Sequence, residues 1–184
     1  MREIFMNGIF QKKHTIQVVI LISCLLLTIH VLTGCKLHYG FSGATIPPEA
    51  KTVSVQYFQN NATLAPPTLS QTFTEALRDK LSSQTRLGLV NKEGDLNFEG
   101  SIVNYTTAPI AIQSTDKAAM NRLTIAVIVK YSCSFDEKKN FEQTFSRFAD
   151  YISTESLSAV EGDLIKEINN QLVQDVFNRA LNDW

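Results

Sequence analysis

The chain has few of the side chains that most enzyme chemistry requires. Its 184 residues include three histidines and three cysteines, and only His38, Cys35 and Cys133 lie beyond residue 34. A Ser-His-Asp or Cys-His arrangement needs a base beside its nucleophile, and the chain after residue 50 has no histidine to supply one. Cys133 lies on the apolar side of an alternating run, which favours a buried thiol over a nucleophile. These absences argue against nucleophilic catalysis.

An excess of basic charge is also missing. The chain has 17 Lys and Arg against 18 Asp and Glu, a net charge of −1, whereas a nucleic-acid-binding protein normally presents a strongly basic face. The sequence contains no glycine-rich phosphate loop and no cluster of His, Cys and carboxylates with metal-ligand spacing. We therefore expect no cofactor, no metal and no nucleic-acid partner.

The N-terminal segment is rich in apolar residues instead. Three basic residues within the first 13 positions precede a run of Val, Ile and Leu over 16–29, which is short for a membrane-spanning helix of ~20 residues. Leu32-Thr33-Gly34-Cys35 follows and resembles the lipobox, in which the cysteine is acylated with fatty acids such as palmitate. We interpret residues 1–34 as a cleaved lipoprotein signal peptide and Cys35 as the lipidation site. A plain secretory signal or an N-terminal membrane anchor is the alternative.

The rest of the chain divides into a tether and one domain. Residues 35–50 contain two glycines after Cys35 and the pair Pro47-Pro48, which predicts a lipidated tether. Residues 51–184 are then a single domain. Because one acyl chain holds a protein to a membrane only marginally and two or more hold it firmly, a multiply acylated Cys35 predicts permanent membrane attachment.

Alternating hydrophobicity predicts strands over 51–58, 86–90, 95–109, 123–135 and 141–152. The clearest pattern runs from Leu123 to Phe135, where the odd positions are apolar or nearly so. Turn residues at 91–94 predict a hairpin between the second and third strands. In the last strand the apolar positions change phase between Phe145 and Phe148, which predicts a bulge.

Two amphipathic helices complete the pattern. Apolar residues recur every four positions from Leu69 to Leu81, and a broad apolar stripe runs from Val160 to Leu181. Capping-box spacing marks both helix starts, in the pairs Thr68 with Gln71 and Ser158 with Glu161. The order of elements predicts an α+β two-layer sandwich, with two α-helices packed on one face of a four- to five-stranded mixed sheet. The strands over 51–58 and 86–90 are candidates for parallel neighbours joined by a crossover.

The predicted layout leaves one sheet face uncovered by the helices, and Thr124, Lys130, Ser132 and Ser134 lie on it. Basic side chains that could contact anionic phosphates, if they converge, are Lys51, Arg86, Arg122 and Lys130. Ordinary solvated charge is the alternative. The acidic residues Glu93, Asp95 and Glu99 flank one turn and could form a glycosidase-like carboxylate pair, although acidic residues at a turn are normally there for solvation.

Several short stretches, in their order and spacing, resemble the lipopolysaccharide-assembly lipoprotein family (LptE) in its Bacteroidetes form. They are Gly34 to Ala44, Lys51 to Val55, Phe73 to Leu77, Gly94 to Gly100, Arg122 to Ile125, Phe148 to Tyr151 and Leu164 to Ile168. The resemblance implies a non-enzymatic lipoprotein, anchored in the outer membrane on its periplasmic side. Such a protein would plug an LptD-like β-barrel that translocates lipopolysaccharide, and would assist insertion of lipopolysaccharide into the outer leaflet.

Of the site residues, only Cys35 carries over from the family, and the four basic residues remain weak candidates for lipopolysaccharide phosphate contacts. Lys36 follows the cysteine without an acidic run, which by resemblance to lipoprotein sorting rules fits the outer membrane. Two alternatives remain open. One is an auxiliary lipoprotein of another envelope export complex, and the more remote one is a periplasmic hydrolase that uses carboxylates.

Overall fold

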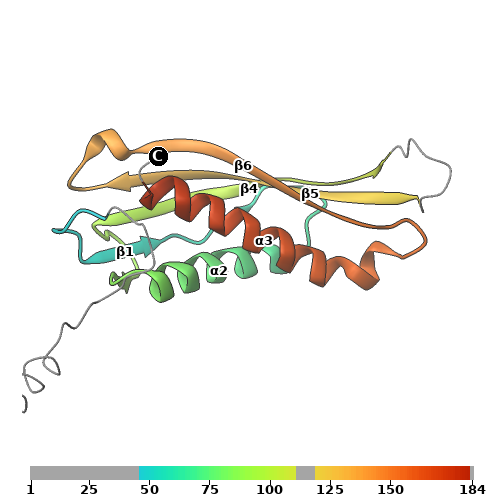
Figure 1. Cartoon of the computed structure of the whole chain (residues 1–184), viewed down its shortest axis with the longest axis horizontal. Coiled ribbons are helices and arrows are strands. Elements are labelled where there is room, and N and C mark those ends of the chain that lie inside the picture. Colours follow the sequence, from blue (N-terminus) through green and yellow to red (C-terminus); the bar gives the residue numbers. More distant parts are fainter. Residues whose placement is uncertain (1–45, 111–118, 183–184) are drawn as a thin grey trace, which may run out of the picture. The chain divides into compact units, whose positions relative to one another are not determined.

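A mixed sheet with two helices on one face makes up most of the part of the chain described by the computed structural model, residues 46–110 and 119–182 (Figure 1). The strand order is β3-β1-β4-β5-β6. The bounds are β1 Thr52–Val55, β3 Gly88–Val90, β4 Leu96–Ile110, β5 Met120–Cys133 and β6 Phe141–Ile152. A two-residue strand, β2 (Gln59–Asn60), pairs with β4 beyond β1. It directly follows the strand predicted over 51–58 and brings the described sheet to six strands.

The three long strands form an antiparallel meander, as their alternation predicts. On β5 the odd positions from Leu123 to Cys133 are buried, while Lys130 on the opposite face is exposed. Phe135 lies beyond the strand and is half exposed. A short 3₁₀ helix, η1 (Glu137–Lys139), connects β5 to β6. The period of two therefore places one apolar face of the meander toward the helices.

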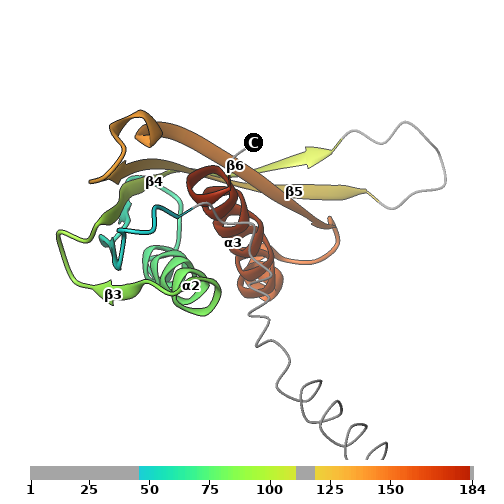
Figure 2. The same ribbon diagram turned by 60° about the vertical axis from the view of Figure 1, so that its left-hand side comes forward.

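Both helices lie on that apolar face (Figure 2). Helix α2 (Thr68–Gln84) packs under β1 and β3, and α3 (Leu157–Leu181) packs under β5 and β6 and beside α2. Leu69, Phe73, Leu77 and Leu81 of α2 are buried at four-residue spacing. Full burial of side chains of this size contributes about 1.5–3 kcal/mol each. The predicted two-layer α+β sandwich is confirmed.

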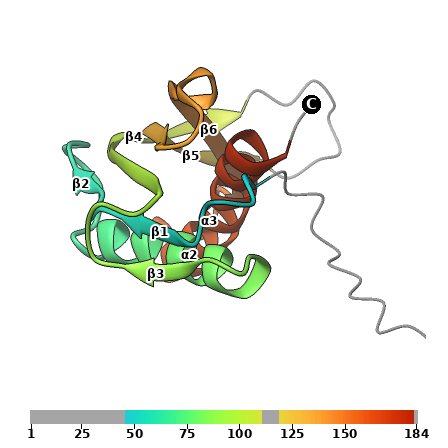
Figure 3. The ribbon, with the colours of Figure 1, turned by 90° about the vertical axis from the view of Figure 1, so that its left-hand side faces the viewer.

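The N-terminal part of the sheet is parallel. As predicted, β1 and β3 are parallel neighbours connected through α2. The predicted hairpin at 91–94 is wrong, because β1 lies between β3 and β4 and is parallel to both (Figure 3). The connection crosses over β1 instead, and a Cβ atom on Gly94 would lie 2.5 Å from the Ser54 nitrogen. Only glycine lets the two backbones approach this closely.

Three finer predictions are also wrong. The register between β5 and β6 is continuous, so no bulge separates Phe145 from Phe148; Phe148 is simply exposed on the other face. The irregularity lies in β4, between Ile102 and Asn104. Neither capping box forms, because Pro67 and Ser156 are the N-cap residues and neither helix has a side-chain cap.

Candidate functional site

The candidate contact surface is the sheet face opposite the helices, which we call the outer face. It carries the even-numbered side chains of β5 and β6, and the register places them in rows across the strands. Over β1 the outer face is covered by the crossing connection, where the Gly94 N–H donates to the buried Ser54 Oγ. The open part of the outer face therefore extends over β4, β5 and β6.

At one end of the outer face, Arg122 is held by two different partners. Its Nε and Nη2 donate to the two carboxylate oxygens of Asp150 at 2.7 and 2.9 Å. Its guanidinium carbon lies 3.5 Å from the ring centroid of Phe148. The hydrogen bond to Asp150 raises the pKa of Arg122, and the same bond lowers the pKa of Asp150. Phe148 is 46% exposed and Ile152 42% exposed, so this end is partly apolar.

Lys130 lies toward the other end of the outer face. Its Nζ is 2.9 Å from Glu99 on β4, and Glu142 lies opposite it on β6. The hydrogen bond to Glu99 raises the pKa of Lys130. Lys130 and Arg122 are eight residues apart on one strand, which corresponds to ~27 Å at ~3.4 Å per residue. They cannot contact the same phosphate.

Lys51 and Arg86 lie beside the parallel strands. The Lys51 carbonyl accepts a hydrogen bond from Gly88 N–H at the start of β3, two residues after Arg86. Both side chains are exposed, and neither forms a salt bridge within the described ranges. The four basic residues therefore do not converge on one site, since Arg122 is at the far end of β5.

The three acidic residues near the crossing have separate roles. Asp95 Oδ2 accepts hydrogen bonds from Lys51 N–H, Thr52 N–H and Thr52 Oγ1 at 2.8–2.9 Å. These bonds, with that from Lys51 N–H the largest cause, lower the pKa of Asp95. Glu99 is paired with Lys130, and Glu93 has a positive φ of 55° in the crossing connection. A general acid needs a raised pKa, whereas that of Asp95 is lowered. The bonds of Asp95 therefore hold the backbone at the start of β1, and the three acidic residues do not form an acid-base pair.

The described part of the chain shows neither a metal site nor an exposed thiol. Within those ranges no group of three His, Cys, Asp or Glu residues could hold a metal ion. The free thiol of Cys133 is buried. Residues 1–45, which include Cys35 and His38, lie outside the described residues.

Among the described helices, none has both the length and the apolar character needed to cross a membrane.

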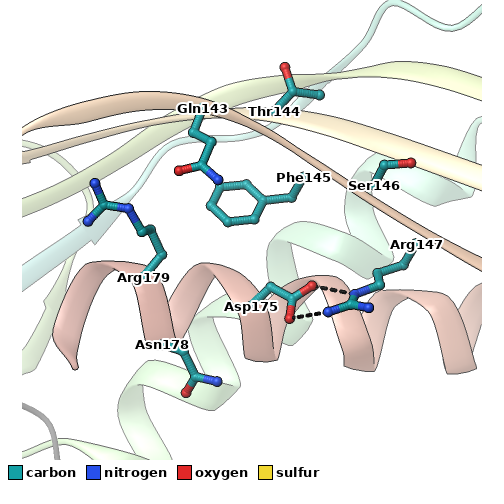
Figure 4. Close-up of a pocket in the computed structure, with 8 residues that line it drawn as sticks. All are labelled: Gln143, Thr144, Phe145, Ser146, Arg147, Asp175, Asn178 and Arg179. Carbon is teal, nitrogen blue, oxygen red and sulfur yellow. Dashed lines mark hydrogen bonds and ion pairs between the residues drawn. The ribbon is translucent and has the colours of Figure 1, made fainter. Parts of the chain in front are cut away.

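A second feature, which the sequence analysis missed, is a shallow depression of about 430 Å³ between β6 and α3 (Figure 4). It is lined by residues 143–147 together with Asp175, Asn178 and Arg179. Arg147 Nε and Nη2 bind the two carboxylate oxygens of Asp175 at 2.5 and 2.8 Å. Gln143 and Arg147 could have indicated this depression from the sequence, because they are polar although they occupy the helix-facing phase of their strand.

Comparisons with known proteins place the chain in a family. The model of the LptE lipopolysaccharide-assembly family matches residues 50–180. Among curated proteins, no similar sequence was found.

Three of the similar solved structures come from different bacteria. A minor lipoprotein of Acinetobacter baumannii is 14% identical, with 72% of this chain and 97% of that chain covered and a TM-score of 0.47. The hypothetical protein CT253 of Chlamydia trachomatis is 11% identical, with 71% and 98% covered and a TM-score of 0.49. An uncharacterized lipoprotein B of Nitrosomonas europaea is 20% identical, with 78% and 88% covered and a TM-score of 0.44.

The assignment depends on the family model, because it spans nearly all of the sheet and both helices. The chain belongs to the LptE family of lipopolysaccharide-assembly lipoproteins.

Proposed function

We propose that this protein is held in the outer membrane by acyl chains on Cys35, faces the periplasm, and acts as plug and assembly partner of an LptD-like β-barrel. In this role it assists insertion of lipopolysaccharide into the outer leaflet. The family match over residues 50–180 carries the proposal. It makes the protein a non-enzymatic envelope lipoprotein of lipopolysaccharide assembly, which acts through contacts with other molecules.

The domain boundaries fit this role. We propose cleavage after residue 34, a tether over 35–50 and one domain over 51–184. The described residues all fall within one compact unit, Ser42–Trp184. Because two or more acyl chains hold a protein firmly, the tether would keep the domain beside the bilayer in which the barrel is embedded.

The outer face is suited to a polar barrel interior. The lumen of a transmembrane β-barrel is polar and lined by water, and the outer face presents Thr124, Ser132 and two ion pairs. Exposed ion pairs of this kind contribute little to stability, typically ~0–1 kcal/mol. Their carboxylates and cations can therefore exchange partners with polar groups of a barrel wall at small cost.

For lipopolysaccharide phosphates, the four basic residues are not equivalent. A phosphate would have to displace Asp150 from Arg122 or Glu99 from Lys130. Lys51 and Arg86 form no salt bridge in the described ranges, although the charge of Lys51 contributes to the lowered pKa of Asp95. We therefore propose Lys51 and Arg86 as the stronger phosphate contacts and Arg122 and Lys130 as the weaker ones.

Co-purification tests the partnership. The full-length chain, tagged at its C-terminus, is extracted from membranes with detergent, and its partners are identified by mass spectrometry. We expect the wild type and a Cys133→Ala control to recover a large β-barrel, and Cys35→Ala to lose membrane attachment. Recovery of the lipidated protein without a large β-barrel contradicts the proposal, and recovery with another export complex supports the auxiliary-subunit alternative.

A binding experiment tests the phosphate contacts. Purified lipopolysaccharide is titrated into the detergent-solubilised chain, and Lys51→Glu and Arg86→Glu are compared with Lys166→Glu, an exposed charge reversal on α3. We expect the first two variants to bind more weakly and the third to match the wild type. Equal affinities for all three variants would refute the ranking of contacts.

A further inference from the structure

The strand β6 is an open edge of the sheet. It is outermost in the strand order, and no described strand pairs with its outer side. The Ser153 N–H donates to the Ala119 carbonyl, directly beyond the last paired residues of β5 and β6. Because hydrogen-bonded pairs alternate in an antiparallel ladder, odd-numbered residues of β6 bond to β5. The N–H and C=O groups of the even-numbered residues, from Glu142 to Ile152, therefore point away from the sheet.

This edge lacks three of the features that protect edge strands, although Arg147 is a charged residue on its helix-facing side. Proteins block long edges with proline, bulges or very short strands. β6 has 12 residues without proline, and its register with β5 is continuous. The opposite edge of the sheet, β3, has three residues. An exposed edge as long as β6 can pair with another extended chain, the peptide-binding mode known as β-augmentation.

The depression beside α3 lies along the helix side of this edge (Figure 4). Phe145, which is 7% exposed, lies between Arg147 on one side and Arg179 on the other. Arg147 is neutralised by Asp175. The Arg179 guanidinium carbon lies 4.6 Å from the Phe141 ring centroid, and Arg179 forms no salt bridge with any residue described. The depression therefore carries one uncompensated positive charge.

We propose that the β6 edge and α3 together bind an extended peptide segment that carries an acidic side chain. The segment adds to β6 as a further strand and bonds to the outward backbone groups of Thr144 and Ser146. Alternate side chains of the segment then face the depression, and an Asp or Glu opposite Phe145 meets Arg179. This site goes beyond the proposed function, because it does not depend on a barrel partner.

The charges of β6 argue against a second copy of this chain as the occupant. Pairing β6 with itself through its even-numbered residues allows two central registers. One places Glu142 opposite Asp150, and the other places Arg147 opposite its own copy. Like charges directly opposite each other destabilise a strand pair, and the ion pairs that Asp150 and Arg147 already form weaken this repulsion without turning it into attraction. We therefore take the occupant to be a different segment with complementary charge.

Two matched peptides serve as probes. Each is a fluorescently labelled seven-residue strand that alternates Thr with apolar Val, with either Glu or Lys at its centre. Fluorescence anisotropy measures their binding to the full-length mature chain in detergent. We expect the Glu peptide to bind about fivefold more tightly than the Lys peptide, the ratio for one partly exposed ion pair.

Three variants locate the site. Ser146→Pro removes an outward N–H, which an edge strand tolerates, and should weaken the Glu peptide on the order of tenfold. Arg179→Glu should reverse the preference between the two peptides. Lys166→Glu, on an exposed position of the same helix, should leave both affinities unchanged.

The opposite results would overturn the proposal. These are equal affinities of the wild type for the two peptides, an unchanged preference in Arg179→Glu, or wild-type binding by a Ser146→Pro variant whose circular dichroism is native. If Ser146→Pro fails to fold, the surface variant Arg179→Glu still decides. Dimerisation of the wild type in sedimentation experiments that Ser146→Pro abolishes would assign the edge to a second copy and also overturn the proposal.

Discussion

The crossing of two backbones at Gly94 gives the sharpest test of the fold. A Cβ atom at this position would lie 2.5 Å from Ser54 N, 2.7 Å from Val53 C and 2.9 Å from Leu96 O. All three are backbone atoms, which cannot rotate away as the end of a side chain can. Gly94→Ala therefore forces β1, the strand between β3 and β4, to move.

The expected cost follows from overpacking. Inserted methyl groups in a packed region cost about 1–3 kcal/mol, and backbone contacts on three sides place Gly94→Ala at the upper end. The lower entropy of the unfolded alanine variant offsets ~0.4–1 kcal/mol. We therefore expect a net loss of about 2 kcal/mol, which lowers the melting temperature by about 4–8 °C for a chain of this length.

Urea unfolding followed by circular dichroism measures this loss, and Gly162→Ala is the matched control. Gly162 lies on an exposed position of α3, and a Cβ atom there would have no neighbour within 4 Å. Because alanine is favoured over glycine within a helix, the control should gain ~0.5–1 kcal/mol. A Gly94→Ala variant within ~0.5 kcal/mol of the wild type, the range of neutral surface changes, would refute the crossing.

Three further predictions concern acid stability, one contact between helix and sheet, and the buried thiol. The pKa of Asp95 lies below its ordinary 3.8, so its bonds to β1 stabilise the fold fully above that value and progressively less as the pH falls through the lowered pKa. In Asp95→Asn the free energy of unfolding should therefore fall less with acidification, as measured by urea unfolding between about pH 2 and pH 6. Tyr105→Phe removes the hydrogen bond to Glu161 at the start of α3 and should cost about 1.5–3 kcal/mol, the range for bonds to charged groups. Burial, the largest cause, raises the pKa of Tyr105, which keeps the phenol a donor. Cys133 is buried and should react with a thiol reagent only as fast as the protein opens.

Each of these has a result that contradicts it. For acid stability, the contradicting result is that the free energy of unfolding of Asp95→Asn changes with pH as much as that of the wild type. For the helix contact, the control is Tyr57→Phe at an exposed ring, and equal stability of the two phenylalanine variants removes the assigned role of Tyr105. For the thiol, complete modification of the native protein within seconds shows that Cys133 is accessible.

The sequence predicts elements well where one face of an element is fully buried. The odd positions of β5 and the four-residue spacing in α2 are both fixed by contact with the same core. The phase of β6 is misread because Phe148 and Ile152 are apolar yet exposed. Arg122 stacks on Phe148, and this cross-strand contact is invisible until the register of β5 with β6 is known.

Contacts between distant segments account for the other differences. The turn residues at 91–94 are typical of a hairpin, but β1 inserts between the strands that they connect. Of the candidate basic residues, Lys130 and Arg122 have carboxylate partners that depend on cross-strand register. The depression between β6 and α3 depends on where α3 lies, which the apolar stripe of the helix does not specify.

Membership of the LptE family makes lipopolysaccharide assembly the role of this chain. The most direct measurement is the lipopolysaccharide that a surface probe can reach in cells depleted of the protein and complemented with the wild type, Cys133→Ala or Cys35→Ala. We predict that depletion removes newly made lipopolysaccharide from the cell surface, that the wild type and Cys133→Ala restore it, and that Cys35→Ala does not. Undiminished lipopolysaccharide at the surface of depleted cells would show that this chain does not serve its assembly.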